Sequence, residues 1–442
     1  MSYTLTQDQI DDSDTMAAGA DIPNFSKAGT GKTLVTMEAI RKTGAQRGLI
    51  LGPMVSLTMW KEELESWLGC TAQILHGQNK VIKENPDFVI TTYDTATRSI
   101  LPYLYKHFDG GVLVNDESQY LRTHTSKRSQ AVFGRDHDGD GGLMEKFDQV
   151  WNLSGNPIMR HSDDLWAQIR PLHPAVMQKY HSLDYDEYVA NFCVRQRRQY
   201  NPRMAPVMAI VASRNEVMLN RMLYEDIGAV RRLEAPDLPP LRERVMSMPI
   251  TGLSPKWGKL ISKMTHEQVI MMLSADGDDD NDLQKAWQAV SLAKVKTLSE
   301  YIADSSLNGP VLVGVWNSNV REAYLEELRE RHGKVFRTVH GGTSRAARDK
   351  IKDEFNEGSI DGIVGQMAAM GVSWNLQKSS SHVVIAQTHY SPGVIEQFYK
   401  RVFRYGQKNP VQLDHALGDH PVDLAIYKLM RQKEGSAEKV LD

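Results

Sequence analysis

Short apolar runs alternate with helical patterns in two separate blocks of this chain. In the first block they predict strands at residues 48–51, 88–92, 112–115 and 150–153, and in the second at residues 311–315, 335–339, 363–364, 383–386 and 411–413. Such alternation is typical of α/β units built on parallel sheets. The predicted fold class is therefore α/β, with two lobes in tandem.

A different pattern separates the two blocks. Residues 159–249 are rich in methionine, arginine and tyrosine, and prolines gather toward the end of the stretch, at Pro202, Pro206, Pro236, Pro239 and Pro240. This composition predicts a helical insertion followed by a linker. The expected domains are lobe 1 at 1–158, the insertion and linker at 159–249, and lobe 2 at 250–442. Residues 274–282 have almost no apolar content, which predicts a disordered loop.

Composition narrows the class of protein. Of the 442 residues, 41% are hydrophobic and 24% are charged, as in a soluble globular protein with two or three domains. No run of about eighteen apolar residues occurs, and the N-terminus is polar and acidic, so neither a membrane span nor a secretion signal is expected. Cys70 and Cys193 lie far apart and suggest no metal site. A reducing interior, cytoplasmic or nuclear, fits best.

A glycine-rich segment indicates a phosphate-binding loop. Residues 26–33 read SKAGTGKT and are followed by a run compatible with a helix. Glycines let backbone amides surround phosphate oxygens, lysine neutralises the phosphates, and the threonine hydroxyl can ligate magnesium. The expected nucleotide ligands are Gly29, Thr30, Gly31, Lys32 and Thr33. Ser26 stands where the full pattern has glycine, and residues 21–25 make a poor strand, so an incidental glycine turn is the alternative.

An acidic pair follows the predicted strand at 112–115. Asp116 is expected to hold Mg²⁺ together with Thr33, and Glu117 is expected to orient and deprotonate the attacking water. Many strands end in a turn that bears aspartate, so the pair alone is weak evidence. Its position after a phosphate-binding loop in the same α/β unit favours a catalytic role.

The order of further motifs resembles helicase superfamily 2 in its Swi/Snf-like version. In the first block these motifs are Pro53 with residues 60–64 (WKEEL), residues 90–94 (ITTYD), 116–119 (DESQ) and 153–157 (LSGNP). Upstream, Leu5 and Gln9 resemble the element whose glutamine reads adenine in this family. Two residues depart from the family pattern: Gln119 replaces histidine and Asn156 replaces threonine. We expect these to alter the coupling between ATP and DNA.

The second block resembles the other half of the same family. The matching segments are residues 338–343, 348–355, 366–376 and 397–407, the last with the form Q-x-x-x-R-x-x-R-x-G-Q. The resemblance implies catalytic roles for Gln397, Arg401 and Arg404 and a nucleotide contact for Gly371. Arg401 and Arg404 are three residues apart, a spacing that predicts one side of a helix. The family places that side at the γ-phosphate.

Segments of the central region resemble the annealing-helicase branch, whose members remodel forked DNA. These segments are residues 213–215, Leu219, residues 230–233 and residues 238–240. The implied fold is two RecA-like lobes, and the implied activity is ATP-dependent translocation on duplex or branched DNA. The implied cofactors are ATP and Mg²⁺. A monomer is expected, located in the nucleoid or in a host cytoplasm if phage-encoded, with recombination or replication proteins as partners.

The resemblance also implies contacts with DNA, at Ser56, Thr92, His340, Thr343, Ser373 and Trp374. Loop-capping or core roles for the same residues are the alternative. Two other functions stay open: an RNA helicase that shares the two lobes, and a weakly hydrolysing, nucleotide-dependent DNA-binding module.

Charge is unevenly distributed along the chain, although its net value is only -3. Residues 136–140 and 276–282 are acidic, whereas residues 122–135 and 195–203 are locally basic. Solvated surface loops are the simplest interpretation of all four stretches. A net acidic protein can still hold a nucleic-acid strand through backbone amides and hydroxyls that contact phosphates.

Overall fold

The computed structural model describes residues 4–19, 21–83, 85–198, 205–233, 238–250, 253, 282–370, 374–404 and 406–442. The chain divides into two compact units. The first comprises residues 1–196, 208–235 and 435–442, and the second comprises residues 197–207 and 236–434. Among the described residues, no helix is both long and apolar enough to cross a bilayer.

The first unit is built on a five-stranded sheet in the order β2-β3-β1-β4-β5, in which all neighbours are parallel. Its strands are β1 (Gly48–Gly52), β2 (Ala72–Leu75), β3 (Phe88–Thr92), β4 (Val112–Asp116) and β5 (Gln149–Leu153). The central strand β1 pairs Gly48 with Phe88 on one side and with Val112 on the other. Because all strands run the same way, their carboxyl ends meet at one edge.

Helices cover both faces of this sheet, and apolar clusters fill the space beneath them. They are α1 (Gln7–Ala18), α2 (Lys32–Thr43), α3 (Leu57–Glu63), η1 (Leu64–Leu68), α4 (Tyr93–Thr95), η2 (Ala96–Ile100), α5 (Leu101–His107), η3 (Ser118–Leu121), α6 (Lys127–Phe133) and η4 (Leu143–Lys146). The side chains of β1, β3 and β4 are buried on both faces, as expected of a parallel sheet between helix layers.

Most of the predicted insertion, residues 159–196 and 208–235, belongs to the first unit, whereas residues 197–207 and those from 236 onward are assigned to the second. Its elements are η5 (Ser162–Leu165), α7 (Trp166–Ile169), α8 (Pro174–Lys179), α9 (Tyr185–Phe192), the paired strands β6 (Cys193–Arg198) and β7 (Val207–Ser213), α10 (Glu216–Arg221) and η6 (Met222–Asp226). Their apolar side chains form one cluster that also contains Phe25, Val440 and Leu441. The insertion therefore shares a core with the first lobe.

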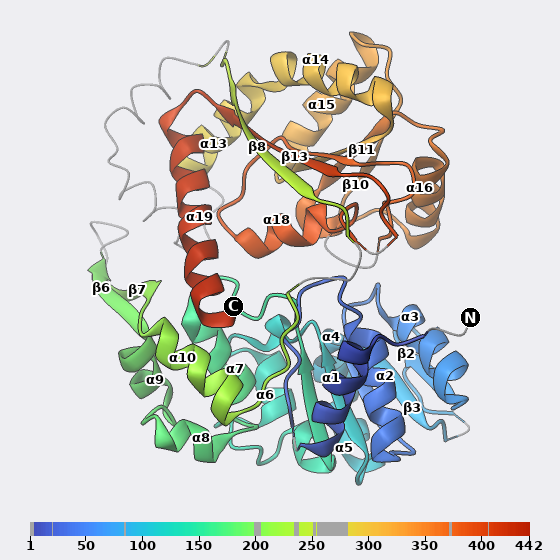
Figure 1. Ribbon diagram of the computed structural model, residues 1–442, viewed down its shortest axis with the longest axis vertical. Coiled ribbons are helices and arrows are strands. Elements are labelled where there is room, and N and C mark those ends of the chain that lie inside the picture. The colour runs from blue at the N-terminus through green and yellow to red at the C-terminus, as the bar shows by residue number, and fades with distance from the viewer. Residues whose placement is uncertain are drawn as a thin grey trace. The chain divides into compact units, whose positions relative to one another are not determined.

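The second unit is built on a six-stranded parallel sheet in the order β10-β11-β9-β12-β13-β8. The strands are β8 (Leu241–Met248), β9 (Val311–Val315), β10 (Phe336–Val339), β11 (Gly362–Gln366), β12 (His382–Ile385) and β13 (Val411–Gly418). Its helices are α13 (Asp282–Ala293), α14 (Val295–Ser305), η7 (Ser306–Asn308), α15 (Ser318–Glu330), α16 (Arg345–Glu357), α17 (Met367–Met370), α18 (Pro392–Tyr399) and α19 (Pro421–Leu441). Figure 1 shows β8 lying beside β13, although the two are far apart in sequence.

The strands agree with the sequence predictions in both blocks, so the α/β class with two parallel sheets is confirmed. The sequence patterns did not reveal β2, β6, β7 and β8. Strand β8 lies inside the range predicted as a linker, because its charged residues hide its pairing with β13 along the edge of the sheet. Most of the predicted loop at 274–282 lies outside the described residues, and Asp282 begins α13.

Candidate nucleotide-binding site

Two glycines shape the loop that precedes α2. Gly29 and Gly31 both have φ of 91°, a left-handed conformation that glycine adopts without strain. Gly31 is the N-cap of α2, so Lys32 and Thr33 form the first turn of the helix. The loop thereby presents backbone amides and a helix N-terminus at the carboxyl edge of the sheet, which is the arrangement that binds phosphate.

The segment before the loop gives the side chain of Ser26 a structural role. The backbone N–H groups of Phe25 and Lys27 donate to the carbonyls of Val230 and Arg232, each at 2.8 Å. The Ser26 hydroxyl accepts a hydrogen bond from the Arg232 N–H at 3.0 Å. The poor strand predicted at 21–25 is thus an extended segment paired with residues distant in sequence, and Ser26 fastens that pairing.

Lys32 lies folded over its own loop. Its Nζ donates to the carbonyls of Ser26 at 2.7 Å and Lys27 at 3.3 Å. Gly155, in the segment after β5, lies against the same loop, since a Cβ placed there would be 3.1 Å from the Ala28 nitrogen and 3.4 Å from the Lys32 Nζ. The LSGNP segment and the glycine-rich loop are therefore in contact.

Gln9 reaches the glycine-rich loop from α1. Its side-chain amide donates to the Thr30 carbonyl at 3.1 Å, and its carbonyl accepts from the Thr6 N–H in a reciprocal capping box. A Cβ on Gly31 would lie 2.4 Å from the Gln9 Nε2. Gln9 therefore lies directly beside the expected phosphate ligands.

Asp116 lies at the carboxyl end of β4, where its carboxylate accepts a hydrogen bond from the Trp60 indole at 2.8 Å. The pKa of Asp116 is raised to about 6: burial and then the neighbouring Glu117 charge raise it, and they outweigh the hydrogen bonds from Trp60 and Ser56 and the positive charge of Lys32, which lower it. The charge of Lys32 acts on Asp116 because sheet and loop bring them together. This juxtaposition is the central feature of the site.

A chain of side-chain hydrogen bonds runs from Glu117 to the LSGNP segment. Gln119 donates to the Glu117 carboxylate at 2.7 Å and accepts from the Ser154 hydroxyl at 2.6 Å. The Ser154 hydroxyl in turn accepts from the Asn156 N–H at 3.1 Å. Glu117 itself has φ of 54°, an uncommon conformation for a residue with a side chain. Gln119 thus links the acidic pair to the segment that contacts the phosphate loop.

A buried polar network supports this chain from beneath, and the sequence motifs did not reveal it. Gln168 accepts from the Ser118 hydroxyl at 2.8 Å and donates to the carbonyls of Pro157 and Asp164 at 2.9 and 2.7 Å. Asn152 joins it by donating to the Gln168 carbonyl at 2.6 Å. Such buried groups hold a unique geometry because each needs its partners.

The paired arginines of the second unit lie differently from the prediction. Helix α18 carries Gln397 but ends at Tyr399, so the expectation that Arg401 and Arg404 share one face of a helix is wrong. Both lie in the turns that follow. Arg401 donates to the Gln397 carbonyl at 2.7 Å, and Arg404 donates to the Trp374 carbonyl at 3.1 Å. Burial lowers the pKa of Arg404.

Arg348 begins one of the matching segments, but the motifs gave no role to its side chain. Its guanidinium donates to the carbonyls of Thr343, His340 and Ala369, each at 3.0 Å. One side chain thereby fixes the loop after β10 against the end of β11 and α17. A fixed guanidinium with three donors in one plane suits this bridging.

The structure places the expected DNA ligands as follows. Ser56 is buried and donates to the Pro53 carbonyl, and Thr92 caps α4 through Thr95. Trp374 is only 5% exposed and packs in the apolar core of the second unit, which favours the core alternative for it. The Thr343 hydroxyl accepts from the His340 N–H in a partly exposed turn. Gly371 and Ser373 lie outside the described residues.

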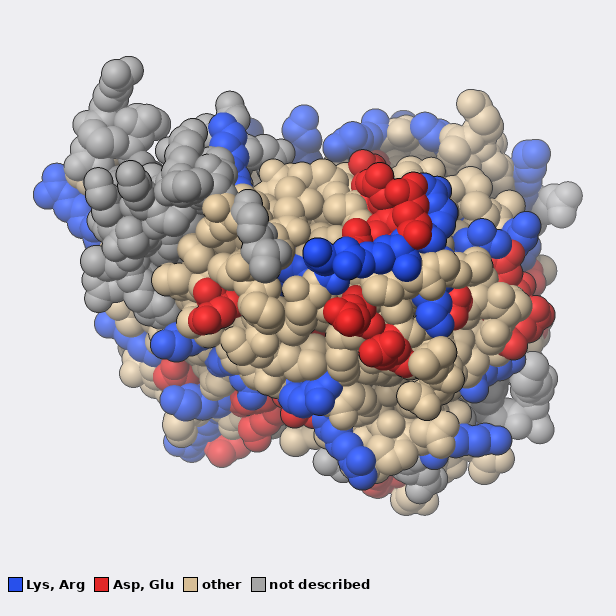
Figure 2. Space-filling view, turned by 90° about the horizontal axis from the view of Figure 1, so that it is seen from above, with Lys and Arg blue, Asp and Glu red and all other residues tan. Residues whose placement is uncertain are grey.

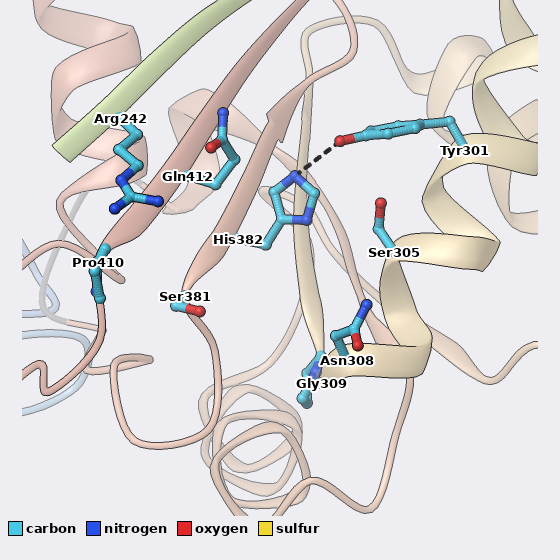
Figure 3. A pocket seen from close by; sticks show the side chains of 10 residues that line it. Arg242, Tyr301, Ser305, Asn308, Gly309, Ser381, His382, Pro410 and Gln412 are labelled. Carbon is cyan, nitrogen blue, oxygen red and sulfur yellow. Dashed lines mark hydrogen bonds between the residues drawn. The ribbon is translucent and has the colours of Figure 1, made fainter.

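A separate pocket of about 350 Å³ lies in the second unit (Figure 3). Arg242, Tyr301 and His382 line it, and Tyr301 and His382 both hydrogen-bond to the buried Asp414. Pro310 and Pro410, which precede β9 and β13, also line the pocket. It therefore lies at the amino ends of the strands, at the opposite edge of the sheet from His340 and Gln366.

Similarity to known proteins identifies the family. The SNF2-related domain matches residues 25–291, and the helicase conserved C-terminal domain matches residues 293–406.

Three relatives illustrate the similarity. The Xenopus tropicalis SWI/SNF-related matrix-associated actin-dependent regulator of chromatin subfamily A-like protein 1 is 22% identical over 403 residues, covering 87% of this chain and 39% of the relative. Human DNA annealing helicase and endonuclease ZRANB3 is 22% identical over 409 residues, covering 87% and 35%. Human DNA repair and recombination protein RAD54B is 22% identical over 481 residues, covering 94% and 51%. The chain thus spans about a third to a half of these relatives.

A solved structure of the Sulfolobus solfataricus SWI2/SNF2 ATPase core in complex with dsDNA is 20% identical, covers 94% of this chain and 88% of that chain, and has a TM-score of 0.44. The family assignment rests on the domain matches, which extend over most of the sequence in the order that the motifs predicted. The chain therefore belongs to the SNF2-related family of superfamily 2, and annealing helicases are among its relatives.

Proposed function

We propose that this protein is an ATP-driven motor that moves along duplex or branched DNA. The observation that carries the proposal is the juxtaposition of Lys32 and Asp116 at the carboxyl edge of the first sheet. A phosphate-binding loop beside a buried carboxylate is the arrangement that nucleotide hydrolysis requires. Family membership and relatives named for DNA annealing and DNA repair support DNA as the track.

The residues of the first unit fit a magnesium-bound nucleoside triphosphate. Gly29 and Gly31 give the loop its left-handed turns, and the missing Cβ of Gly31 lets the Gln9 side chain lie against the loop. Thr33 and Asp116 are the residues that would hold Mg²⁺, because hydroxyl and carboxylate oxygens are its preferred protein ligands. When bound, the ion neutralises charge on the phosphates.

Glu117 would orient the attacking water and accept its proton. Its carboxylate is held by Gln119, so the base is directed before substrate arrives. Preorganised groups of this kind lower the barrier because they need not rearrange during the reaction. The replacement of histidine by Gln119 preserves a side chain that donates and accepts at once, which supports hydrolysis over a purely structural role.

The second unit would supply Arg401 and Arg404 to the phosphate that is transferred. Guanidinium groups stabilise the charge that develops on that phosphate. Arg404 contacts the carbonyl of Trp374, in the segment that resembles motif V. A change at Arg404 on hydrolysis would therefore reach the segment that the family resemblance assigns to DNA. Gln397, on helix α18, would act in catalysis together with Arg401 and Arg404.

The proposal also covers the oligomeric state, the preferred DNA structure, the partners and the location of the protein. We propose a monomer that prefers forked DNA, acts with recombination or replication proteins, and works in the nucleoid. The similarity to a relative named as a DNA annealing helicase supports the preference for forks, because the resemblance assigns fork remodelling to that branch.

The decisive experiment measures ATP turnover by the full chain with double-stranded DNA, forked DNA, single-stranded DNA and RNA. We expect stimulation by duplex or forked DNA, no turnover by Lys32→Ala, and nucleotide binding without efficient hydrolysis by Arg404→Ala. Stimulation by RNA alone would favour the RNA helicase. Nucleotide-dependent DNA binding without turnover would favour a binding module.

A further inference from the structure

A basic pocket of about 360 Å³ lies beside the acidic pair in the first unit, outside the expected nucleotide ligands. Arg98, Arg122, Lys127 and Arg128 line it, and Asp94 is the acidic residue that also lines it. The residues that line the pocket come from α4 and η2, from η3 and the turn after it, and from the start of α6. It contains part of the locally basic stretch at 122–135.

The negative charge of Asp94 does not neutralise the positive charges of the side chains that line this pocket. Arg128 makes a bidentate pair with Asp94 at 2.9 and 2.8 Å, and Arg98 approaches the same carboxylate only at 3.9 Å. The side chain of Arg98 is 77% exposed. Within the described part of the chain, Lys127 has no ion pair. The pocket therefore retains an excess of positive charge available to an anion.

Arg122 is a partly exposed cation of the pocket, with 33% of its side chain accessible to solvent. Its Nε is buried and has no hydrogen-bond partner among the described residues, since the Asp164 carboxylate lies 3.6 Å away. Its Nη1 donates to the Gln119 carbonyl at 3.2 Å. Arg122 shares the Asp164 carboxylate with Arg160, which lies 3.7 Å from it, so this ion pair does not neutralise Arg122 alone. The exposed part of the Arg122 side chain can therefore attract an added anion.

An aromatic side chain lies next to the cations. Tyr120 is 38% exposed, its ring stacks on Tyr93 at 6.0 Å, and the Arg128 guanidinium lies over it at 5.6 Å. Several cations beside a partly exposed ring suit a nucleic-acid strand better than a free phosphate, because the strand offers both a charged backbone and flat sugar or base surfaces.

We propose that this pocket binds the phosphate backbone of a nucleic acid and that Arg122 passes its occupancy to Glu117 through Gln119. The proposal rests on the proposed function, and it defines where the first unit contacts the track. A phosphate beside Arg122 competes with the Gln119 carbonyl for the same guanidinium. Because the Gln119 side chain holds Glu117 at 2.7 Å, a shift of Gln119 changes the direction of the base.

The first test compares two double variants of the full chain. Arg98→Ala/Lys127→Ala removes two charges from the pocket, whereas Lys106→Ala/Lys296→Ala removes two exposed lysines that do not line it. Duplex DNA binding is measured by fluorescence anisotropy over a range of salt concentrations. We expect the pocket variant to bind at least several-fold more weakly and its salt slope to fall by about 1 to 2. The control should match the wild type.

The outcomes separate this proposal from the proposed function. If the wild type shows DNA-stimulated turnover and the pocket variant binds DNA with unchanged affinity and salt slope, the pocket proposal is overturned while the motor stands. If the wild type is not stimulated by any nucleic acid, the motor itself fails. Thermal unfolding of each variant confirms that the fold is retained.

The second test examines the connection to Glu117. Arg122→Lys keeps the positive charge of the pocket but loses the planar donor to the Gln119 carbonyl. We expect this variant to bind duplex DNA within about twofold of the wild type but to lose most of the DNA stimulation of kcat, about tenfold or more. Normal stimulation by Arg122→Lys would contradict transmission through Arg122.

Discussion

Gln119 holds the carboxylate of Glu117 by a hydrogen bond of 2.7 Å, although the family resemblance has histidine at the position of Gln119. The same side chain accepts from Ser154, so one amide connects the acidic pair with the segment that contacts the phosphate loop. Gln119, which departs from the family pattern, is therefore a hydrogen-bonded part of the site.

Replacing Gln119 tests this connection. Gln119→Ala should lower kcat for ATP hydrolysis by about tenfold or more, because Glu117 loses the group that orients it, while KM changes little. Gln119→His should recover part of the loss, since an imidazole also donates and accepts. Steady-state kinetics at saturating DNA provide the measurement. An unchanged kcat in Gln119→Ala would show that Glu117 is positioned by other groups.

Asp116 gives nucleotide binding a dependence on pH. Burial raises its pKa to about 6, so Asp116 is ionised at pH 7.5 and largely protonated at pH 5. Because Mg²⁺ needs the carboxylate, the affinity for Mg²⁺–nucleotide should fall below about pH 6, by up to about tenfold per pH unit. Equilibrium binding of a fluorescent nucleotide at several Mg²⁺ concentrations measures this. An affinity independent of pH between 5 and 7.5 would contradict it.

Glu117→Gln is the matched control for this titration. It removes the neighbouring charge that raises the pKa of Asp116, so the midpoint should move to lower pH, while the protonation of the nucleotide itself is common to both proteins.

The raised pKa of Asp116 also affects the stability of the fold. The folded pKa lies above the ordinary value of 3.8, so folding is disfavoured progressively as pH rises from about 4 to about 6. Glu117→Gln should reduce that loss.

Gln9 links α1 to the phosphate loop, and Gln9→Ala should therefore weaken nucleotide binding. Loss of its hydrogen bond to the Thr30 carbonyl should raise KM for ATP about three- to tenfold, with little change in kcat. Gln7→Ala is the control, because Gln7 lies on the same helix and its side chain donates to the exposed Asp11. Equal KM values for the two variants would show that Gln9 has no part in the site.

A buried ion pair should govern the stability of the second unit. Lys294 and Asp423 are 2.6 Å apart and both side chains are fully buried. Lys294→Met alone should lower the free energy of unfolding by about 3–5 kcal/mol, because it leaves a buried charge unpaired, whereas Lys294→Met/Asp423→Leu should lose much less. Denaturant unfolding measures both.

The exposed pair Arg329–Glu330 provides the comparison, since breaking it should change the unfolding free energy by less than about 1 kcal/mol. If Lys294→Met also changes the unfolding free energy by less than about 1 kcal/mol, the buried pair does not stabilise the second unit.

The motifs of the site were predictable because each depends on residues close in sequence. The glycine loop, the acidic pair after β4 and the strand segments follow from local patterns of glycine, charge and apolar runs. The juxtaposition of Lys32 and Asp116 also follows, since parallel strands bring their carboxyl ends to one edge. The edge strand β8 escaped because its pairing is with residues far along the chain.

The turn that carries Arg401 and Arg404 could not be read from spacing alone. A separation of three residues fits a helix, but α18 ends at Tyr399, and the Arg404 guanidinium is held by the Trp374 carbonyl instead. Gln168 lies in no motif, and Arg348 begins a segment that matches the family. The structural roles of both could not be predicted, because they depend on bonds to backbone carbonyls distant in sequence or in neighbouring loops.

The sequence by itself determined the α/β class, the two blocks of strands and the order of the motifs, because local periodicity and motif chemistry are written in neighbouring residues. Only the tertiary structure decided how Ser26 is fastened to Arg232, how Gln119 joins Glu117 to Ser154, and how Arg122 is left with an unpartnered donor. These are pairings of polar groups across loops, and a polar group chooses its partner only after packing has fixed which groups lie within hydrogen-bond distance.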